Sequence, residues 1–305
     1  MIKKSHVFAY CLLFISVMQT CIYANILEYS IKKETKLIKK DSPYIIEKDL
    51  VIEKGATLII EPGVIIKFAP NIGNTKNKII VHGTLIAKGE ENNRIYFTSE
   101  YQKPGVWGGI IFIKNDNREK SIIEYCQIEF STCGVGAFSS SPDIVNNVFY
   151  SNEVAIVCED YSSPKIFKNN LLQNGTFRSV AGGISCAFYS SPEIRDNSIE
   201  KTLGDGIRTA VFSNPVISNN FIGYGAGRGI TVCSKSSPKI INNNLFRNGC
   251  SCGIVIYEAS PIITGNKIHE NRAPGISALI KSTPIISNNY FTKNGIGLKS
   301  IYSSP

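Results

Sequence analysis

Four charged residues in the middle of the chain are of the types that bind ions or move protons. Asp205 and Arg228 each stand directly before a Gly-Ile pair, and Arg208 lies three residues after Asp205. Glu159 closes an apolar run further upstream. A carboxylate can donate or accept a proton or ligate Ca²⁺, and a guanidinium holds anionic groups through several N–H donors. These four residues form the candidate patch, provided that the elements carrying them come together in space.

The elements that must position these residues belong to a repeat. Seven times an asparagine follows a proline by five residues, and successive prolines are separated by 22, 28, 23, 23, 23 and 23 residues. A fixed period in this range indicates stacked supersecondary units. The one long spacing predicts a bulge around residues 175–182. The prolines are Pro142, Pro164, Pro192, Pro215, Pro238, Pro261 and Pro284, and the asparagines are Asn147, Asn169, Asn197, Asn220, Asn243, Asn266 and Asn289.

Each repeat contains three short apolar runs. Isoleucine stands two residues after every proline, a large apolar residue stands seven after it, and most units continue with a turn and a Gly-Ile pair. Runs of this kind, rich in β-branched residues, are typical of strands, and no unit contains ten residues of helical period. Coils of three strands, stacked about 4.8 Å apart, bury a continuous apolar axis that a single coil cannot bury. The predicted fold is therefore all-β: a parallel β-helix with three short strands per coil.

The asparagine column is interpreted as structural and not as a ligand site. Asparagine tolerates a left-handed backbone at a sharp bend. Its side-chain amide can also bond the amides of the coils above and below, as in stacked asparagine ladders. Cys126 takes the equivalent position in the coil before Pro142.

The repeat resembles the right-handed parallel β-helix proteins of the pectin-lyase-like group, whose coils carry the pattern P-x-I-x-x-N-x-I. The stretches 50–68, 79–99, 107–112 and 121–129 are similar to the N-terminal region of bacterial exported β-helix proteins. The resemblance covers nearly all of the chain after residue 24. With the general preference of parallel crossovers, it implies a right-handed coil. It does not fix the function, because this fold hosts lyases, hydrolases, adhesins and inert scaffolds.

The resemblance also implies roles for the candidate patch. In β-helix lyases and hydrolases the polysaccharide lies on the outward face of the third strands. There Arg208 would be the base or a substrate clamp, and Glu159 or Asp205 would be the acid or a Ca²⁺ ligand. The alternative is an ordinary surface ion pair between Asp205 and Arg228, worth about 0–1 kcal/mol. The outward column of the third strands is Val157, Ser185, Arg208, Thr231, Val255, Ser277 and Lys299.

Other features of the sequence count against catalysis. Glycoside hydrolysis normally needs two carboxylates about 5–9.5 Å apart, and no outward pair with that spacing is evident. The acidic motifs of polygalacturonase-like enzymes and the acidic calcium cluster of pectate lyases are missing, as are a phosphate loop, a nucleophile elbow and zinc spacing. After residue 24 the histidines are His82 and His269, and His269 stands beside Glu270 on a turn, which is typical of a surface histidine.

These observations favour a non-catalytic exported protein, namely a surface or periplasmic scaffold, an adhesin or a carbohydrate-binding module, with no cofactor. The alternative is a polysaccharide lyase or glycoside hydrolase that acts on an acidic glycan, with calcium as the expected ion for a lyase. A third hypothesis is a chain degenerated from a longer protein. The expected partner is a polysaccharide or cell-surface glycan. Nucleic acid is not expected, because aromatic residues are not interleaved with a basic stripe.

Residues 1–24 have the features of an export signal. Two lysines precede an apolar stretch over residues 7–17, and a cleavage site follows at Ala24. The stretch is short for a membrane span, and no later segment resembles one. Cleavage is expected, with lipid attachment at Cys21 and an uncleaved anchor as alternatives. The predicted location is secreted, periplasmic or at the cell surface.

The rest of the chain is expected to have three parts: a lead-in over residues 25–44, N-terminal capping coils over residues 45–120, and the regular array over residues 121–305. The net charge of +9 falls to +7 when the two lysines of the signal are removed. The Lys-rich run 31–40 is interpreted as a solvated linker or capping strand, with contact to an acidic polysaccharide or a membrane surface as the alternative. The last three residues repeat the opening of a coil, which indicates truncation or fraying, or a partner that covers the end.

Seven cysteines follow residue 24, and an odd number argues against a complete disulfide framework. Cys158 and Cys186 occupy equivalent inward positions in neighbouring coils, where a stacked pair of buried thiols is favoured over a bridge. The Cys-Ser-Cys turn at residues 250–252 is a weak candidate for a soft metal, because no histidine stands beside it. Trp107 is expected to pack within the capping coils, with sugar stacking as the alternative.

Overall fold

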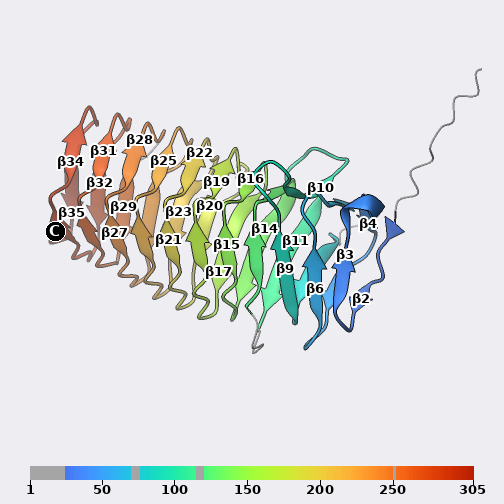
Figure 1. Cartoon of the computed structure of the whole chain (residues 1–305). Helices are drawn as coiled ribbons and strands as arrows, with labels where there is room; N and C mark the ends of the chain where they lie inside the picture. Colours follow the sequence, from blue (N-terminus) through green and yellow to red (C-terminus); the bar gives the residue numbers. More distant parts are fainter. Residues whose placement is uncertain (1–24, 70–75, 115–119, 250–251) are drawn as a thin grey trace, which may run out of the picture.

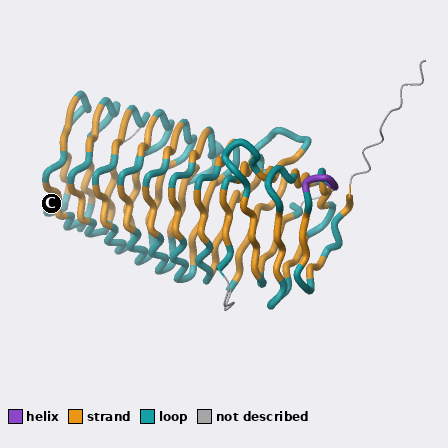
Figure 2. Tube along the Cα trace, in the orientation of Figure 1, coloured by secondary structure: helices purple, strands orange, loops and turns teal. Residues whose placement is uncertain are grey.

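The chain winds into a right-handed solenoid, an elongated stack of similar coils (Figure 1). This computed structural model describes residues 25–69, 76–114, 120–249 and 252–305. Short strands alternate with turns along the whole stack, and one 3-10 turn, η1 (Lys39–Asp41), lies near its start (Figure 2). The expected export signal and most of the Cys-Ser-Cys turn lie outside the described residues.

Every coil contributes one strand to each of three parallel sheets. A strand therefore pairs with the strands three before and three after it in sequence. Residues about one repeat apart become neighbours, so that Ile207 pairs with Ile230 and Ile230 with Ile254. This is the parallel β-helix with three strands per coil that the repeat predicts.

The strands of the three sheets have the following bounds. The first sheet contains β1 (Asn25–Ile26), β4 (Tyr44–Ile46), β7 (Ile65–Phe68), β10 (Ile95–Ser99), β13 (Cys126–Glu129), β16 (Val148–Tyr150), β19 (Asn170–Leu172), β22 (Ser198–Glu200), β25 (Phe221–Gly223), β28 (Asn244–Phe246), β31 (Lys267–His269) and β34 (Tyr290–Thr292). The second sheet contains β2 (Ser30–Ile31), β5 (Leu50–Ile52), β8 (Lys78–Val81), β11 (Trp107–Ile113), β14 (Ser131–Phe138), β17 (Val154–Glu159), β20 (Ala181–Cys186), β23 (Asp205–Thr209), β26 (Ile230–Cys233), β29 (Ile254–Tyr257), β32 (Ile276–Leu279) and β35 (Leu298–Ile301). The third sheet contains β3 (Thr35–Leu37), β6 (Thr57–Ile60), β9 (Thr84–Lys88), β12 (Ile122–Glu124), β15 (Asp143–Val145), β18 (Lys165–Phe167), β21 (Glu193–Arg195), β24 (Val216–Ser218), β27 (Lys239–Ile241), β30 (Ile262–Thr264) and β33 (Ile285–Ser287).

Residues 25–44, expected to form a lead-in, contribute instead to the first coil of the solenoid. They contain β1, β2 and β3, which pair with the next strand of each sheet. Ile31 and Leu37 from this segment are buried in the core. The Lys-rich run 31–40 is therefore part of the stack, because its apolar residues alternate inward between solvated lysines.

The bulge predicted around residues 175–182 is present. β19 ends at Leu172 and β20 begins at Ala181, so the additional residues lie between a first-sheet and a second-sheet strand. The hydroxyls of Thr176 and Ser179 are hydrogen bonded to each other, the N–H of Thr176 donates to the Ser179 hydroxyl, and the N–H of Ser179 donates to the Thr176 carbonyl. The Ser179 hydroxyl also donates to the carbonyl of Glu153 in the preceding coil. The loop is thus tied to the stack at its base.

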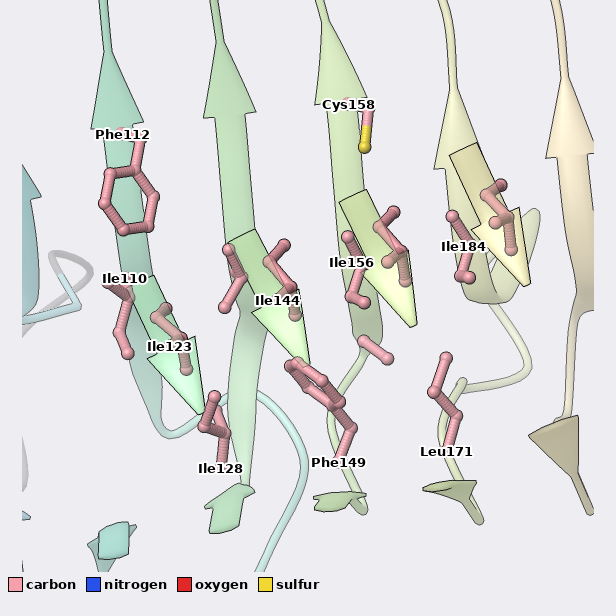
Figure 3. Packing of buried hydrophobic residues seen from close by; sticks show 14 of the residues in the cluster. Ile110, Phe112, Ile123, Ile128, Ile144, Phe149, Ile156, Cys158, Leu171 and Ile184 are labelled. Atoms are coloured by element: carbon pink, nitrogen blue, oxygen red, sulfur yellow. The ribbon is translucent and has the colours of Figure 1, made fainter. Parts of the chain in front are cut away.

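The core is a column of aliphatic and aromatic side chains enclosed by the three sheets. Figure 3 shows Ile144, Phe149 and Ile156 pointing inward from three successive strands of one coil. All three are fully buried, as are their equivalents in the next coil. Burying such a side chain contributes about 1.5–3 kcal/mol, so the regular inward isoleucines account for much of the stability of the stack.

Trp107 packs in the core and is not exposed for sugar stacking. Its ring lies 3.8 Å from that of Phe68 at an interplanar angle of 11°. Its indole N–H donates to the carbonyl of Glu129 at 2.8 Å, and the side chain is completely buried.

The asparagine column forms a ladder inside the turn between the third and first sheets. Each side-chain amide donates to Oδ1 of the next asparagine and to a carbonyl of the preceding coil. Asn197, for example, donates to Asn220 at 2.9 Å and to the carbonyl of Ile166 at 2.8 Å. Cys126 heads the ladder as predicted, since its N–H donates to Oδ1 of Asn147. The column is structural.

The left-handed bend does not fall on the ladder asparagines themselves. It falls on the residue before each of them, for example Asn219 (φ 56°), Asn242 (φ 54°) and Gly265 (φ 69°). The expectation that the ladder residue adopts this conformation is therefore wrong. The preceding residue turns the chain, which leaves the asparagine in a position to direct its amide into the turn.

Two further ladders were not predicted. A second asparagine ladder occupies the turn after the first sheet, in two segments: Asn152 with Asn174, and Asn248 with Asn271 and Asn294. A serine ladder occupies the turn after the second sheet, where the N–H of each residue donates to the hydroxyl of the next; it includes Ser140, Ser162, Ser190, Ser213 and Ser236. At the turns that carry a ladder, buried polar side chains thus accept hydrogen bonds from the backbone N–H groups of the neighbouring coil.

Cys158 and Cys186 are a stacked pair of buried thiols. They are paired positions of β17 and β20, and both side chains are fully buried. Both are free cysteines. A hydrogen bond with Cys186 and burial in the core hold the pKa of Cys158 well above its usual range.

Candidate functional site

The outer face of the second sheet brings together three of the four residues of the candidate patch. Asp205 and Arg208 belong to β23, and Arg228 stands just before β26, the next strand of the sheet. The glycines that follow Asp205 and Arg228 allow close approach of the coils, because a Cβ on Gly206 would lie 2.7 Å from the carbonyl oxygen of Gly229. Side chains at the start of these two strands therefore meet.

Asp205 lies between two guanidinium groups. Its Oδ2 is 3.8 Å from Nη1 of Arg208 and 3.9 Å from Nη1 of Arg228. The backbone N–H of Arg228 donates to its Oδ1 at 3.4 Å. The side chain of Asp205 is 6% exposed, whereas those of Arg208 and Arg228 are 29% and 40% exposed. These ion pairs are longer than charge-assisted hydrogen bonds of about 2.7–2.9 Å, so both arginines keep N–H donors for a further acceptor.

Two buried polar atoms at this place have no hydrogen-bond partner within the described part of the protein: Oδ2 of Asp205 and Oγ1 of Thr231. Thr231 is the paired residue of Arg208 on β26 and is 3% exposed. Buried polar atoms are nearly always hydrogen bonded, so such atoms on adjacent strands need explanation. A hydroxyl from solvent or from a ligand would complete their bonding. We call Asp205, Arg208, Arg228 and Thr231 the arginine site.

Glu159, the fourth residue of the candidate patch, is not part of the arginine site. It is the last residue of β17, and β20 lies between β17 and β23. The residue of β17 in register with Arg208 is Val157, and Glu159 follows it by two positions. Two strand spacings alone place it on the order of 10 Å from Arg208 along the stack. Burial, and secondly the charge of Asp160, raise the pKa of Glu159.

The outward column of the third strands alternates as predicted, but it is less exposed than its polar residues suggest. Thr231, Val255 and Ser277 are buried, and only Lys299 at the end is fully exposed. Side chains of adjacent strands stand about 4.8 Å apart, so small residues between longer ones are shielded by their neighbours. Thr231 stands directly after Arg208 in this column, and its place there could have predicted that it lies beside Arg208.

Positive charge continues along the face beyond the arginine site. Burial raises the pKa of the Cys252 thiol, while a hydrogen bond with Ser277 and the charges of Arg228 and Lys299 oppose this rise. Arg228 and Lys299 therefore act on the same region. At the arginine site itself, Arg208 and Arg228 outnumber the single carboxylate of Asp205, so the site attracts anions.

Metal binding has little support in the described ranges. They contain no group of three or more His, Cys, Asp or Glu side chains placed to hold a metal ion. At Asp205, the two guanidinium groups would repel a cation. His269 serves packing: its Nε2 lies 2.8 Å from Oδ1 of Asn244, and its ring stacks on Phe246 at 4.6 Å.

Two solved structures share the fold of this chain. A double mutant of the periplasmic alginate epimerase AlgG aligns with a TM-score of 0.61 and 13% identity, over 88% of this chain and 71% of that one. The enzymatically active domain of bacteriophage CBA120 tailspike protein 2 aligns with a TM-score of 0.52 and 10% identity, over 90% of this chain and 43% of that one. At such identities the likeness shows the fold alone.

A short segment resembles a much larger animal protein. It is 40% identical over 63 residues to Protein bark beetle of Drosophila melanogaster, which is 21% of this chain and 2% of that protein. Since the chain spans so little of that protein, the match indicates a shared coil pattern. No helix in the described residues is long and apolar enough to cross a membrane.

Two family descriptions match the chain directly. The pectate-lyase-like β-helix domain matches residues 30–136. The right-handed β-helix region matches residues 108–261 and 239–305, which together are more than half of the chain. With three parallel sheets, an inward isoleucine column and buried asparagine ladders, the chain belongs to the family of right-handed β-helix proteins.

Proposed function

We propose that this protein is exported and binds an acidic polysaccharide at the arginine site without cleaving it. The observation that carries this proposal is the pair of partly exposed guanidinium groups of Arg208 and Arg228, which lie 3.8 and 3.9 Å from the buried carboxylate of Asp205. Such an arrangement suits a ligand that offers both an anionic group and hydroxyls. A uronate residue of a polysaccharide has this chemistry.

The proposed contacts follow from the charges on the face. Arg208 and Arg228 hold the ligand carboxylate, because a guanidinium offers paired donors that match carboxylate oxygens. Asp205 holds the two guanidinium groups beside each other, since its Oδ2 lies 3.8 Å from Nη1 of Arg208 and 3.9 Å from Nη1 of Arg228. Lys299 lies four strands further along the same sheet, where it is exposed to further anionic residues of the same glycan chain.

The number of carboxylates supports a site that does not hydrolyse the glycan. Asp205 is a single carboxylate, and Glu159 lies two strands away, which does not provide the two facing groups that glycoside hydrolysis requires. The fold shared with an alginate epimerase and a phage tailspike agrees with a glycan ligand. Export is supported by the basic start and apolar stretch of residues 1–24.

Binding of the purified protein to an array of acidic and neutral polysaccharides tests the proposal. We expect binding to uronate-containing glycans that weakens as salt is added, since exposed charges are screened. The double variant Arg208→Ala, Arg228→Ala should lose at least about tenfold in affinity, equal to about 1.4 kcal/mol. Arg247→Ala is the matched control, because Arg247 is an exposed arginine paired with Glu270 in the turn after the first sheet. Equal binding by the double variant would exclude the arginine site. Cleavage that Asp205→Asn abolishes would show a lyase or hydrolase instead.

A further inference from the structure

Three exposed aromatic rings stack at the turn between the second and third sheets. Tyr161 and Tyr189 lie 5.0 Å apart between ring centroids at 6°, and Tyr189 and Phe212 lie 5.2 Å apart at 4°. All three occupy the position three residues before the repeat proline, with a positive φ that directs the side chain outward. We call these three rings the aromatic ladder.

The two ends of the aromatic ladder differ. Beyond Phe212, the ammonium group of Lys235 lies 5.5 Å from the ring centroid and covers that face. Before Tyr161, the equivalent position is Ser139, a small and exposed residue. Tyr161 is accordingly 72% exposed, compared with 46% for Tyr189 and 39% for Phe212. Within the described residues, Tyr189 is the ring that stacks on Tyr161, so its other face is open.

The open face of Tyr161 lies among hydrogen-bonding groups. Glu159 and Asp160 precede it directly, and the hydroxyl of Ser139 belongs to the adjacent coil. An apolar ring face gains from covering another apolar face, and the carboxylates and the hydroxyl accept hydrogen bonds from hydroxyls at the edge of a ligand. A pyranose ring offers both, an apolar C–H face and an edge of hydroxyls. Two carboxylates disfavour an anionic ring here.

We propose that Tyr161 is the platform of a second subsite, which takes an uncharged sugar ring stacked over Ser139 as the next rung of the aromatic ladder. This inference rests on the proposed function, because it places a second residue of the same polysaccharide. The arginine site lies two coils away along the stack and has two arginines for one carboxylate, whereas the turn of Tyr161 carries two carboxylates, with Lys114 one coil beyond Ser139. The ligand class is therefore a heteropolysaccharide that contains both acidic and uncharged residues.

Calorimetric titration with three sets of oligosaccharides tests this subsite: uncharged, uronate-only and mixed. Tyr161→Ala should weaken binding of the mixed set about tenfold, because the apolar contact between the ring and the sugar face is lost. Tyr161→Phe should retain wild-type affinity, because it keeps the ring. Uronate-only oligosaccharides should bind wild type and Tyr161→Ala equally. Tyr224→Ala, which removes an exposed tyrosine from another turn, is the matched control.

The outcomes separate the subsite from the proposed function. If Tyr161→Ala binds the mixed set as wild type does while Arg208→Ala does not, the platform is wrong and the arginine site stands. If wild type binds only uncharged oligosaccharides and Tyr161→Ala abolishes this binding, the platform stands and the arginine site is wrong. If wild type binds no set, both are overturned. A lowered unfolding temperature in Tyr161→Ala with unchanged affinity would show that the ladder serves stability alone.

Discussion

Asn220 and Asn243 are joined by two hydrogen bonds across neighbouring coils. Oδ1 of Asn243 accepts from the backbone N–H of Asn220 at 2.9 Å and from its side-chain amide at 2.9 Å. Both side chains are almost completely buried. One oxygen thus satisfies two donors of the adjacent coil, and the arrangement repeats from Asn147 to Asn289. The register of the stack is maintained in part by this column.

Removal of one ladder side chain should destabilise the protein. In Asn243→Ala the backbone N–H and the side-chain amide of Asn220 each lose the bond to Oδ1 of Asn243, and the carbonyls of Ile217 and Ile241 each lose one donor. We expect a loss of about 2–4 kcal/mol in free energy of unfolding, because each unsatisfied buried group costs about 1–3 kcal/mol and partial rearrangement recovers some of it. Urea denaturation measures this loss.

The neighbouring residue provides the control for Asn243→Ala. Asn242 is exposed and has a φ of 54°, which glycine adopts without strain. Asn242→Gly should therefore change stability by less than about 0.5 kcal/mol. Equal losses in the two variants would show that the hydrogen bonds of the ladder are not the source of the effect.

The sequence predicts the fold well because each coil contacts only its neighbours. The inward isoleucines, the asparagine column and the bulge before β20 follow from spacing alone, since position in the repeat determines position in the stack. The first coil was missed because the strands of residues 25–44 are only two or three residues long and charged residues interrupt their apolar pattern. The serine ladder was missed because a serine before proline also reads as an ordinary turn residue.

The arginine site is only partly visible in the sequence. The adjacency of Asp205 and Arg228 follows from their place before the glycines, but Glu159 stands two coils earlier and is too far along the stack to join them. The unpartnered oxygens of Asp205 and Thr231 depend on side-chain burial, which repeat spacing does not give. The stacking of Tyr161 on Tyr189 depends on side-chain direction at a left-handed residue, which the pattern also leaves undefined.

The buried thiols should resist alkylation in the folded protein. Burial raises the pKa of Cys126 far above the usual range, and a hydrogen bond with Cys186 together with burial does the same for Cys158, so little thiolate forms near neutral pH. Mass spectrometry after iodoacetamide treatment should show these residues unmodified in native protein and modified in denaturant. A disulfide between Cys158 and Cys186, seen without reductant, would contradict the thiol pair.

Glu159 should make stability fall as pH rises. Its pKa is raised in the folded state, so the folded protein binds the proton more tightly than the unfolded chain does. Stability is therefore greater below the ordinary carboxyl pKa and decreases as pH rises through the raised value. Glu159→Gln should remove this decrease and give a small gain at neutral pH, measured by unfolding at several pH values.

Glu270 provides a control of opposite sign for the pH measurement. A hydrogen bond from Arg247 lowers its pKa, so its contribution is present above the ordinary carboxyl pKa and is lost as pH falls through the lowered value. Glu270→Gln should therefore reduce the stability difference between neutral and acidic pH. A Glu159→Gln variant that behaves in the same direction as Glu270→Gln would contradict the assignment.

Asp205→Asn distinguishes binding from catalysis. In the proposed binding mode it removes a negative charge between Arg208 and Arg228, so affinity for an acidic glycan should be retained or increased. The substitution should cost about 1–3 kcal/mol in stability, because two guanidinium groups lose their counter-charge. Calorimetry and denaturation measure the two effects separately. If the wild-type protein cleaves a glycan, and Asp205→Asn abolishes this cleavage without lowering the affinity for the glycan, the protein is an enzyme.

The most direct test is the structure of the protein in complex with an acidic oligosaccharide. The account predicts a ligand carboxylate within hydrogen-bonding distance of both Arg208 and Arg228, on the outer face of the second sheet. A sugar bound on the first or third sheet, with the arginine site contacting only water, would contradict it.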